Sequence, residues 1–274
     1  MANPSTEQRE IRIEKLKKLE AMGINAYPQI YKPTAFSDAL NAKYKDLAPD
    51  TQTDDEVKVA GRVMAYRNSG MFMDIYDTTG KIQIFCSKEH LPEFEQDKIA
   101  LIDIGDYIGV KGKVKRTKRG ELTVNAEEVT FLCKSLLPLP EKFHGLTDIE
   151  IRYRQRYLDL ITNPESMETL RKRSKIVSSV RTTLEEKGML EIETPVLHPI
   201  LGGANAKPFI THHNALNQDF FLRIATELYL KKLIVGGFEG VFDLGKNFRN
   251  EGIDIKHNPE FTAVEVYWVY KDYY

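Results

Sequence analysis

Charged and aromatic residues of the kinds that bind small charged molecules gather in the last part of this sequence, residues 241–274. The segment after Pro259 alternates between apolar and polar residues, and successive side chains of a β-strand point to opposite faces. The alternation therefore predicts a strand with one buried face and one face available for chemistry. The apolar face would carry Thr262, Val264, Val266, Trp268 and Tyr270. The other face would carry Phe261, Ala263, Glu265 and Tyr267.

The preceding segment alternates in the same way and predicts the first strand of a hairpin. Its apolar face would hold Phe242, Leu244 and Phe248, and its polar face would hold Asp243, Gly245, Asn247 and Arg249. The connecting residues 251–260 include a glycine, an asparagine and a proline, which favour turns. With the apolar faces buried, the opposite face presents an arginine, a glutamate and aromatic rings to a ligand that carries both signs of charge. The alternative is a solvated strand face without a ligand.

The motifs of this region resemble those of a known enzyme class. FRNE, then a loop with HNPEF, then a glutamate two residues before a tyrosine, is similar to motif 2 of the class II aminoacyl-tRNA synthetases. Within that class, RYRQRYLDL, GGANAKPFITHHNAL and RNEGIDIKHNPEF resemble lysyl-tRNA synthetases. The resemblance covers almost the whole chain. It implies a ligase that converts lysine and ATP to lysyl-adenylate and pyrophosphate and then transfers lysine to tRNA(Lys).

The resemblance also implies roles for individual residues. Arg249 would be the main catalytic group, because a guanidinium can clamp the α-phosphate and the substrate carboxylate. Phe261 would stack on adenine. The ATP site would be lined by Arg249, Glu251, His257, Asn258 and Phe261. The lysine site would be formed by Glu227, Arg249, Glu265 and Tyr267, whose paired carboxylates would compensate a buried ammonium.

Glu227 also has a purely structural interpretation. Thr226 is suited to cap a helix, and a carboxylate in the first turn of a helix is favourable. Thr226 stands where the family usually has proline, and Gly240 where arginine is common.

The elements ahead of this region predict a helix over residues 5–22, a short helix near 37–41 and then five strand-like segments with a helix at 92–102 between them. This pattern is typical of a five-stranded OB-type barrel. Alternation places Lys111, Lys113 and Lys115 on one barrel face, so we expect one basic wall. The net charge of -1 argues against a globally basic nucleic-acid binder, which makes such local clusters the candidate phosphate contacts.

In lysyl-tRNA synthetases such a barrel holds the tRNA anticodon, and the matching positions are Arg67, Phe72, Gln83 and Glu121. The resemblance implies that Phe72 stacks on the middle anticodon base while the other three read base edges. As bare sequence, an aromatic residue in a barrel strand is more often part of the core.

The predicted organisation is α+β and multidomain. Residues 1–55 form an N-terminal helical extension, 56–134 an OB-fold anticodon-binding domain, 135–147 a linker and 148–274 the first part of a class II antiparallel-sheet catalytic domain. Asn163 and Pro164 favour a helix start, and Gly188 favours its end. GMLEIETPVL resembles motif 1, which implies a homodimer interface at Pro195; the alternative is an ordinary helix-to-strand crossover.

Composition and length limit the remaining possibilities. With 274 residues, 42% hydrophobic and 29% charged, the chain is expected to be soluble and to form two domains. No apolar run is long enough to cross a bilayer and no signal core is present, so we expect a cytoplasmic protein. Cys86 and Cys133 lack CxxC spacing and are expected in the core, and no metal site is expected within this chain.

The sequence ends immediately after motif 2 and contains nothing like motif 3, whose arginine grips ATP in class II enzymes. The ligands for Mg²⁺ would also lie downstream. We therefore expect a truncated form that is inactive alone. The competing interpretation is a non-catalytic fragment that binds the tRNA anticodon or dimerises. A ligase that attaches lysine to a protein is a further alternative, although the enzymes of that kind lack the barrel.

Overall fold

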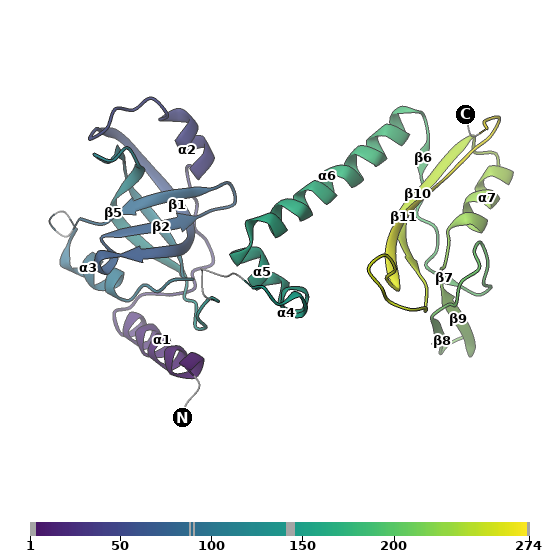
Figure 1. Cartoon of the computed structure of the whole chain (residues 1–274), viewed down its shortest axis with the longest axis horizontal. Helices are drawn as coiled ribbons and strands as arrows, with labels where there is room; N and C mark the ends of the chain where they lie inside the picture. Colours follow the sequence, from purple (N-terminus) through teal and green to yellow (C-terminus); the bar gives the residue numbers. More distant parts are fainter. Residues whose placement is uncertain (1–3, 88, 90, 141–145, 273–274) are drawn as a thin grey trace. The chain divides into compact units, whose positions relative to one another are not determined.

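A computed structural model describes residues 4–87, 89, 91–140 and 146–272 of the chain (Figure 1). It divides into two compact units, Met1–Thr162 and Asn163–Tyr274. Residues 141–145 of the predicted linker lie outside the described residues.

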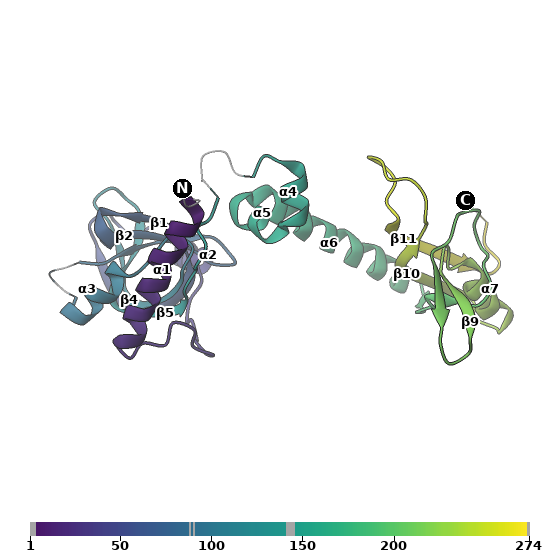
Figure 2. The same ribbon diagram turned by 90° about the horizontal axis from the view of Figure 1, so that it is seen from below.

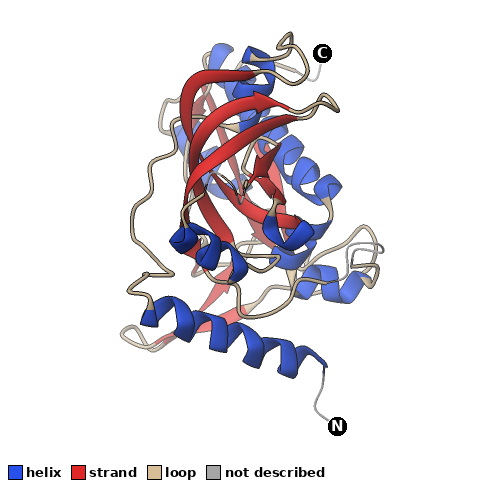
Figure 3. Ribbon diagram, turned by 90° about the vertical axis from the view of Figure 1, so that its left-hand side faces the viewer, coloured by secondary structure: helices blue, strands red, loops and turns tan. Residues whose placement is uncertain are grey.

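The first unit is built around a closed five-stranded barrel. Its strands pair in the order β1-β2-β3-β5-β4, with β3 and β5 parallel and the other described pairs antiparallel, and Figure 3 shows them curving round one another. The strands are β1 (Gln52–Arg67), β2 (Phe72–Tyr76), β3 (Lys81–Phe85), β4 (Tyr107–Arg116) and β5 (Leu122–Cys133). The prediction of an OB-type barrel is confirmed.

Period-two alternation fills the barrel with aliphatic side chains. On β4, Val110 and Val114 are fully buried, and between them Gly112 leaves room for the neighbouring strand. A Cβ at Gly112 would lie 2.0 Å from the carbonyl oxygen of Asn125, so only glycine permits this close pairing. The remaining core side chains come from all five strands, from α3 (Glu93–Ala100), which follows β3 as predicted, and from the two helices ahead of β1 and adjoining loops.

The face of β4 that was expected to be basic is largely neutralised. Lys111 pairs with Glu56 at 3.0 Å, and Lys113 pairs with Asp54 at 3.2 Å, because β1 brings acidic residues opposite β4. The expectation of a basic wall is therefore wrong for these two lysines. The prediction for the cysteines is half right, since Cys86 is buried and Cys133 is exposed.

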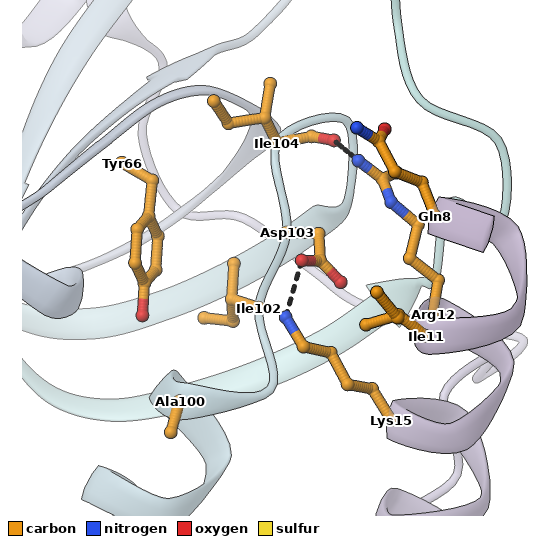
Figure 4. A pocket seen from close by; sticks show the side chains of 9 residues that line it. All are labelled: Gln8, Ile11, Arg12, Lys15, Tyr66, Ala100, Ile102, Asp103 and Ile104. Atoms are coloured by element: carbon orange, nitrogen blue, oxygen red, sulfur yellow. Dashed lines mark hydrogen bonds and ion pairs between the residues drawn. The ribbon is translucent and has the colours of Figure 1, made fainter. Parts of the chain in front are cut away.

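The N-terminal helix α1 (Pro4–Ala21) docks on the barrel through polar contacts as well as Leu19 (Figure 2). Arg12 donates to the carbonyl oxygens of Ser135, Leu137 and Ile104 at 2.9–3.2 Å. Lys15 pairs with Asp103 at 2.6 Å beside a cleft of about 380 Å³, and Figure 4 shows both cations directed at residues 103–104. These cations hold the helix against the barrel.

Beneath this contact lies a buried lysine. The Lys134 ammonium, whose side chain is fully buried, donates to Leu101 O at 2.9 Å, to Asp103 at 2.6 Å and to Asp106 at 2.7 Å. One ammonium therefore ties the end of β5 to the loop between α3 and β4.

The remaining helices of this unit are short. They are α2 (Ser37–Lys43), the 3₁₀ turn η1 (Asn68–Gly70), α4 (Ile149–Arg154) and α5 (Arg156–Thr162). On α5 the fully buried Asp159 accepts from Arg152 at 2.7 Å and from Arg156 at 2.6 Å, which joins α4 to α5.

The second unit contains the long helix α6 (Pro164–Glu186) and two three-stranded sheets. One sheet has the order β11-β10-β6 and the other β7-β9-β8. Their strands are β6 (Leu190–Glu191), β7 (Leu197–His198), β8 (Ile210–His213), β9 (Gln218–Leu222), β10 (Gly240–Phe248) and β11 (Glu260–Trp268), with helix α7 (Glu227–Val235) packed on the first sheet. The predicted start of α6 at Pro164 is confirmed, and Gly188 follows its end with φ +85°.

Burial in this unit departs from one prediction. The apolar face of β11 was expected to be buried, but Val264, Val266 and Trp268 are 41%, 40% and 36% exposed. On that face the Arg173 guanidinium of α6 donates to the Thr262 hydroxyl at 2.8 Å. The alternation of the strand is right, and the layer that would cover it is absent from the described part of the unit.

Among the described helices, none combines the length and the apolar character that crossing a membrane requires.

Replacing Lys134 should destabilise the barrel strongly. In Lys134→Met the partly buried Asp103 and the fully buried Asp106 lose the ammonium that they pair with. Breaking a buried charge pair costs about 3–5 kcal/mol. Hydrogen exchange of the β5 amides, followed by mass spectrometry, reports this unit separately from the other. The control Lys113→Met breaks a more exposed pair and should change protection by no more than about 1 kcal/mol. Equal protection in the two variants would contradict the assigned role.

Candidate functional site

The pairing of β10 with β11 brings the predicted site residues of the hairpin onto one face. Asp243 lies opposite Glu265, and Asn247 lies opposite Phe261. The ladder continues one step further, because the Arg249 amide donates to the Pro259 carbonyl at 2.8 Å. The predicted division of the hairpin into two faces is therefore confirmed.

Arg249 lies against an aromatic ring rather than against a carboxylate. Its guanidinium carbon is 5.0 Å from the centre of the Phe261 ring, which is a cation–π distance. Its Nε is buried and has no hydrogen-bond partner among the described residues. A planar cation held in this way presents hydrogen-bond donors to an incoming anion.

The strand that carries these groups is held by a buried ion pair. Arg223 and Asp243 are 4% exposed each and lie 2.9 Å apart, and Arg223 also donates to the Lys246 carbonyl at 2.8 Å. Asp243 accepts in addition from the amide and the hydroxyl of Thr194 at 3.0 and 2.6 Å. A Cβ at Gly245 would come within 2.4 Å of the Arg223 guanidinium, so the pair fits only because this position is glycine.

Two glutamates and a tyrosine meet at the start of α7. The Thr226 amide donates to Glu265 at 3.2 Å, which places that carboxylate at the positive end of the helix. Burial raises the pKa of Tyr267, and the nearby Glu227 and Glu265 raise it further, so the phenol remains a neutral hydroxyl. Thr226 occupies the predicted cap position, but its helical backbone (φ −98°, ψ −7°) leaves its buried hydroxyl without a partner. The prediction that its side chain caps α7 is wrong.

An internal ammonium already occupies this acidic cluster. Lys231 Nζ lies 2.5 Å from Glu227 Oε1, one helical turn away, and 5.8 Å from the centre of the Tyr267 ring. The pairing with Glu227 raises the pKa of Lys231. Sequence reasoning missed this contact, although the i,i+4 spacing of Glu227 and Lys231 was a signal for it.

The loop at residues 202–209 joins the start of the hairpin loop. Asn250 donates its amide to the Lys207 carbonyl at 2.7 Å, and the Lys207 amide donates to the Glu251 side chain at 3.1 Å. His257 bonds Asp254 at 2.7 Å, and both His257 and Asn258 are exposed. The structure thus places Glu251 near the loop, and it leaves His257 and Asn258 at the solvent.

Unsatisfied polar atoms gather near these groups. Thr226 Oγ1, Asn247 Oδ1 and Arg249 Nε are all buried without a partner among the described residues. Buried polar groups are normally hydrogen-bonded, so each calls for a polar partner. The arrangement fits a polar ligand at this face of the hairpin.

A second candidate site lies on the barrel. A groove of about 910 Å³ contains all four predicted anticodon residues, Arg67, Phe72, Gln83 and Glu121. Strand register explains why they meet, because Arg67 lies opposite Phe72, Phe72 opposite Phe85, and Gln83 opposite both Asp74 and Thr123. The Phe72 and Phe85 rings are 4.9 Å apart, centre to centre.

Each of the three predicted polar residues in the groove has an internal partner. Arg67 pairs with Asp74, Glu121 pairs with Lys81 at 2.8 Å, and Gln83 accepts from the Thr123 hydroxyl at 3.0 Å. Lys115, the third lysine of the β4 row, lies 5.8 Å from the centre of the Phe85 ring. Sequence reasoning missed Asp74, Lys81 and Phe85, although alternation with the predicted residues placed Asp74 and Phe85 on the same face.

Two other predictions concern residues outside these sites. Pro195 is exposed, and its carbonyl oxygen lies 2.9 Å from His198 Nε2. Within the described ranges, no three His, Cys, Asp or Glu side chains are grouped so that they could hold a metal ion.

Two protein-family models match different parts of the chain. Residues 148–274 match the tRNA synthetases class II (D, K and N), and residues 57–132 match the OB-fold nucleic acid binding domain of anticodon-binding proteins. Residues 148–274 are therefore similar to class II tRNA synthetases. The match begins at residue 148, ahead of the boundary between the compact units at residues 162 and 163.

Individual relatives within this synthetase family are lysine–tRNA ligases. The ligase of Sinorhizobium medicae is 56% identical over 270 residues, which cover 98% of this chain and 54% of the relative. That of Rhizobium meliloti is 55% identical over 99% of this chain and 55% of the relative, and that of Nostoc punctiforme is 51% identical over 97% and 49%. The chain spans about half the length of the curated relatives it matches. The predicted resemblance to lysyl-tRNA synthetases is confirmed, and the individual site residues stay predictions.

Removing the carboxylate of Asp243 should destabilise the synthetase-like second unit. In Asp243→Asn the Arg223 guanidinium stays buried without its counter-charge, so the free energy of unfolding should fall by roughly 3–5 kcal/mol. Trp268, the only tryptophan, lies on β11, so its fluorescence in urea reports this unit.

The matched control is Asp219→Asn, which breaks an exposed pair with His212. It should change the free energy of unfolding by no more than about 1 kcal/mol. A midpoint for Asp243→Asn that equals this control would show that the buried pair does not hold the strand.

Proposed function

We propose that this chain is part of a lysine–tRNA ligase, which activates lysine with ATP and transfers it to tRNA(Lys). The observation that carries the proposal is the meeting of Arg249, Phe261, Glu265 and Tyr267 on one face of the hairpin, in a chain similar to lysine–tRNA ligases over nearly its whole length. The fold alone would not separate lysine from aspartate or asparagine as substrate.

The charges of the hairpin site fit a lysine substrate. Glu227 and Glu265 lie beside the neutral hydroxyl of Tyr267 and offer two carboxylates to an ammonium. The proximity of Lys231 to the same groups supports this assignment, because an ammonium is already accommodated there. Aspartate or asparagine would bring no side-chain ammonium to these carboxylates.

Arg249 fits the reacting end of the substrates. In the first step a carboxylate oxygen of lysine attacks the α-phosphorus of ATP, and the bond from that phosphorus to the pyrophosphate oxygen breaks. A guanidinium with free donors stabilises the charge that gathers on the α-phosphate oxygens. Adenine would stack on Phe261, either on the ring face that Arg249 leaves open or after Arg249 moves toward the phosphate.

Glu251, His257 and Asn258 complete the proposed ATP site around the hairpin loop. In the second step a ribose hydroxyl of the tRNA end attacks the carbonyl carbon of lysyl-adenylate, and AMP leaves. Mg²⁺ would accompany ATP and is assigned no ligand among the described residues.

The barrel groove fits the anticodon. Two adjacent aromatic rings, tilted by 36° to each other and flanked by hydrogen-bonding side chains, suit unstacked bases of single-stranded RNA. We assign Phe72 to stacking and Arg67, Gln83 and Glu121 to base edges. The remaining assignments follow the family as well, with a homodimer whose interface includes Pro195 and a cytoplasmic location.

Lysine activation can be tested by exchange of labelled pyrophosphate into ATP. This chain alone is expected to show little exchange. In a full-length ligase that contains it, we expect exchange that requires lysine, that arginine and aspartate do not support, and that falls at least about 100-fold in Arg249→Ala. The control Arg173→Ala removes an arginine that contacts Thr262 on the opposite strand face, and it should retain exchange.

Exchange that survives in Arg249→Ala would refute the assigned site. No exchange in any variant, together with binding of a lysine tRNA anticodon stem-loop, would favour the second interpretation, a chain that reads tRNA without catalysis.

Lys231 should compete with the substrate for Glu227. In Lys231→Met the carboxylate is vacated, so the affinity for lysine should rise by roughly two- to fivefold, a small effect because the pair is exposed to solvent. Titration calorimetry with lysine measures it. The neighbouring Lys232→Met, whose ammonium lies over Tyr229, should leave the affinity unchanged. Weaker binding in Lys231→Met would mean that this lysine orients Glu227 for the substrate instead.

A further inference from the structure

We propose that Asp74 is a positioning residue that makes Arg67 read a base edge rather than bind a phosphate. The inference rests on the proposed function of the barrel groove as the anticodon site, and it deepens that function. Nothing in the sequence motifs singled out Asp74. It lines the groove and binds Arg67 there.

The geometry of the pair is that of a fixed fork. Arg67 Nη1 donates to Asp74 Oδ2 at 3.1 Å, and Nη2 donates to Oδ1 at 2.7 Å. Bidentate pairs of this kind restrict the guanidinium plane as well as its position. Asp74 lies diagonally across the β1–β2 ladder from Arg67, since Arg67 is opposite Phe72 and Asp74 is opposite Ala65. The pair therefore spans the strands beside the stacking ring.

Burial shows which partner is the anchor. The Asp74 side chain is 12% exposed and the Arg67 side chain is 47% exposed. The carboxylate is thus part of the barrel wall, while the guanidinium extends from it into the groove. Arg67 keeps N–H donors that Asp74 does not use, because a guanidinium has five and the pair engages two.

Charge decides what those remaining donors select. A free arginine beside RNA binds phosphate in any sequence, and it adds to the salt dependence of binding. With its charge compensated by Asp74, Arg67 gains less from a phosphate and is left to recognise acceptors on a base edge at a fixed position. The Lys81–Glu121 pair applies the same compensation on the other side of the groove.

The rim of the groove differs from this floor. Lys118 is 84% exposed and 3.9 Å from Asp50, beyond hydrogen-bond distance. Arg119 is exposed as well. These cations extend into solvent from the turn between β4 and β5, where a phosphate backbone can reach them. The groove therefore separates phosphate contacts at the rim from base contacts at the floor.

The test compares Asp74→Asn with the unmodified chain for binding to RNA. The probes are the anticodon stem-loop of a lysine tRNA and variants with single substitutions at each of the three anticodon bases. Affinities are measured over a range of salt concentrations.

In Asp74→Asn we expect the preference for the unmodified loop to fall about tenfold at one base position, because a freed arginine no longer distinguishes base edges. The slope of log affinity against log salt should steepen by about 0.7, the value for one further phosphate contact on a single strand.

Two further variants connect the effect to Arg67. Arg67→Ala should lose the same preference, and Asp74→Asn in that background should lose no more, because Asp74 acts through Arg67. Asp54→Asn breaks the exposed Asp54–Lys113 pair, whose residues do not line the groove, and it should leave the preference unchanged. An Asp74→Asn effect that persists fully in Arg67→Ala would overturn the proposal, and so would an unchanged preference in Asp74→Asn.

Failure of the proposed function would look different. In that case the unmodified chain would bind all the stem-loops equally and Phe72→Ala would bind them as well as the unmodified chain. If the unmodified chain discriminates and Phe72→Ala binds weakly, the groove is the reading site, and only the role of Asp74 is then at issue.

Discussion

The second unit depends on the register between β10 and β11, because a strand presents alternate side chains to opposite faces. A slip of one residue would place Arg249 and Glu265 on opposite faces of the hairpin, each among apolar side chains of the other strand. The buried pair of Arg223 with Asp243 holds β10, one of the two strands, in place. Arg223 also donates to the Lys246 carbonyl, so it binds the backbone of β10 as well as the Asp243 side chain. The residues that β10 contributes to the site therefore depend on this ion pair for their position.

In the barrel, the strand register is fixed because the sheet closes on itself. Each of its strands is paired on both sides, so register is set around the ring and no edge is left free. Arg67, Phe72 and Phe85 then fall in one row across three strands. The backbone hydrogen bonds around the barrel therefore position the strands that line the groove. The orientation of each groove side chain is then set by its local partners.

Periodicity was sufficient to predict the strands, the barrel and the two faces of the hairpin, since alternation is a local property of the sequence. What it could not supply were contacts between segments far apart in the chain. The acids on β1 that neutralise Lys111 and Lys113 lie more than fifty positions from them, and the exposure of Cys133 depends on what packs beyond β5. The Thr226 hydroxyl failed as a cap because its backbone is already helical, which residue type alone does not reveal.

The two sites share one electrostatic arrangement. Groups proposed to bind a charged ligand are already paired with a charge of the chain itself, Arg67 with Asp74 and Glu227 with Lys231. At Glu227 a ligand must therefore exchange partners with Lys231, and the net gain in affinity is smaller than the contacts alone suggest. Arg67 instead keeps its pair with Asp74 and offers its remaining donors. A ligand that fits the geometry loses little in this exchange, whereas a ligand of the wrong charge leaves one partner uncompensated. Such pairing favours selectivity over strength, which suits the proposed discrimination of one amino acid and one anticodon from close competitors.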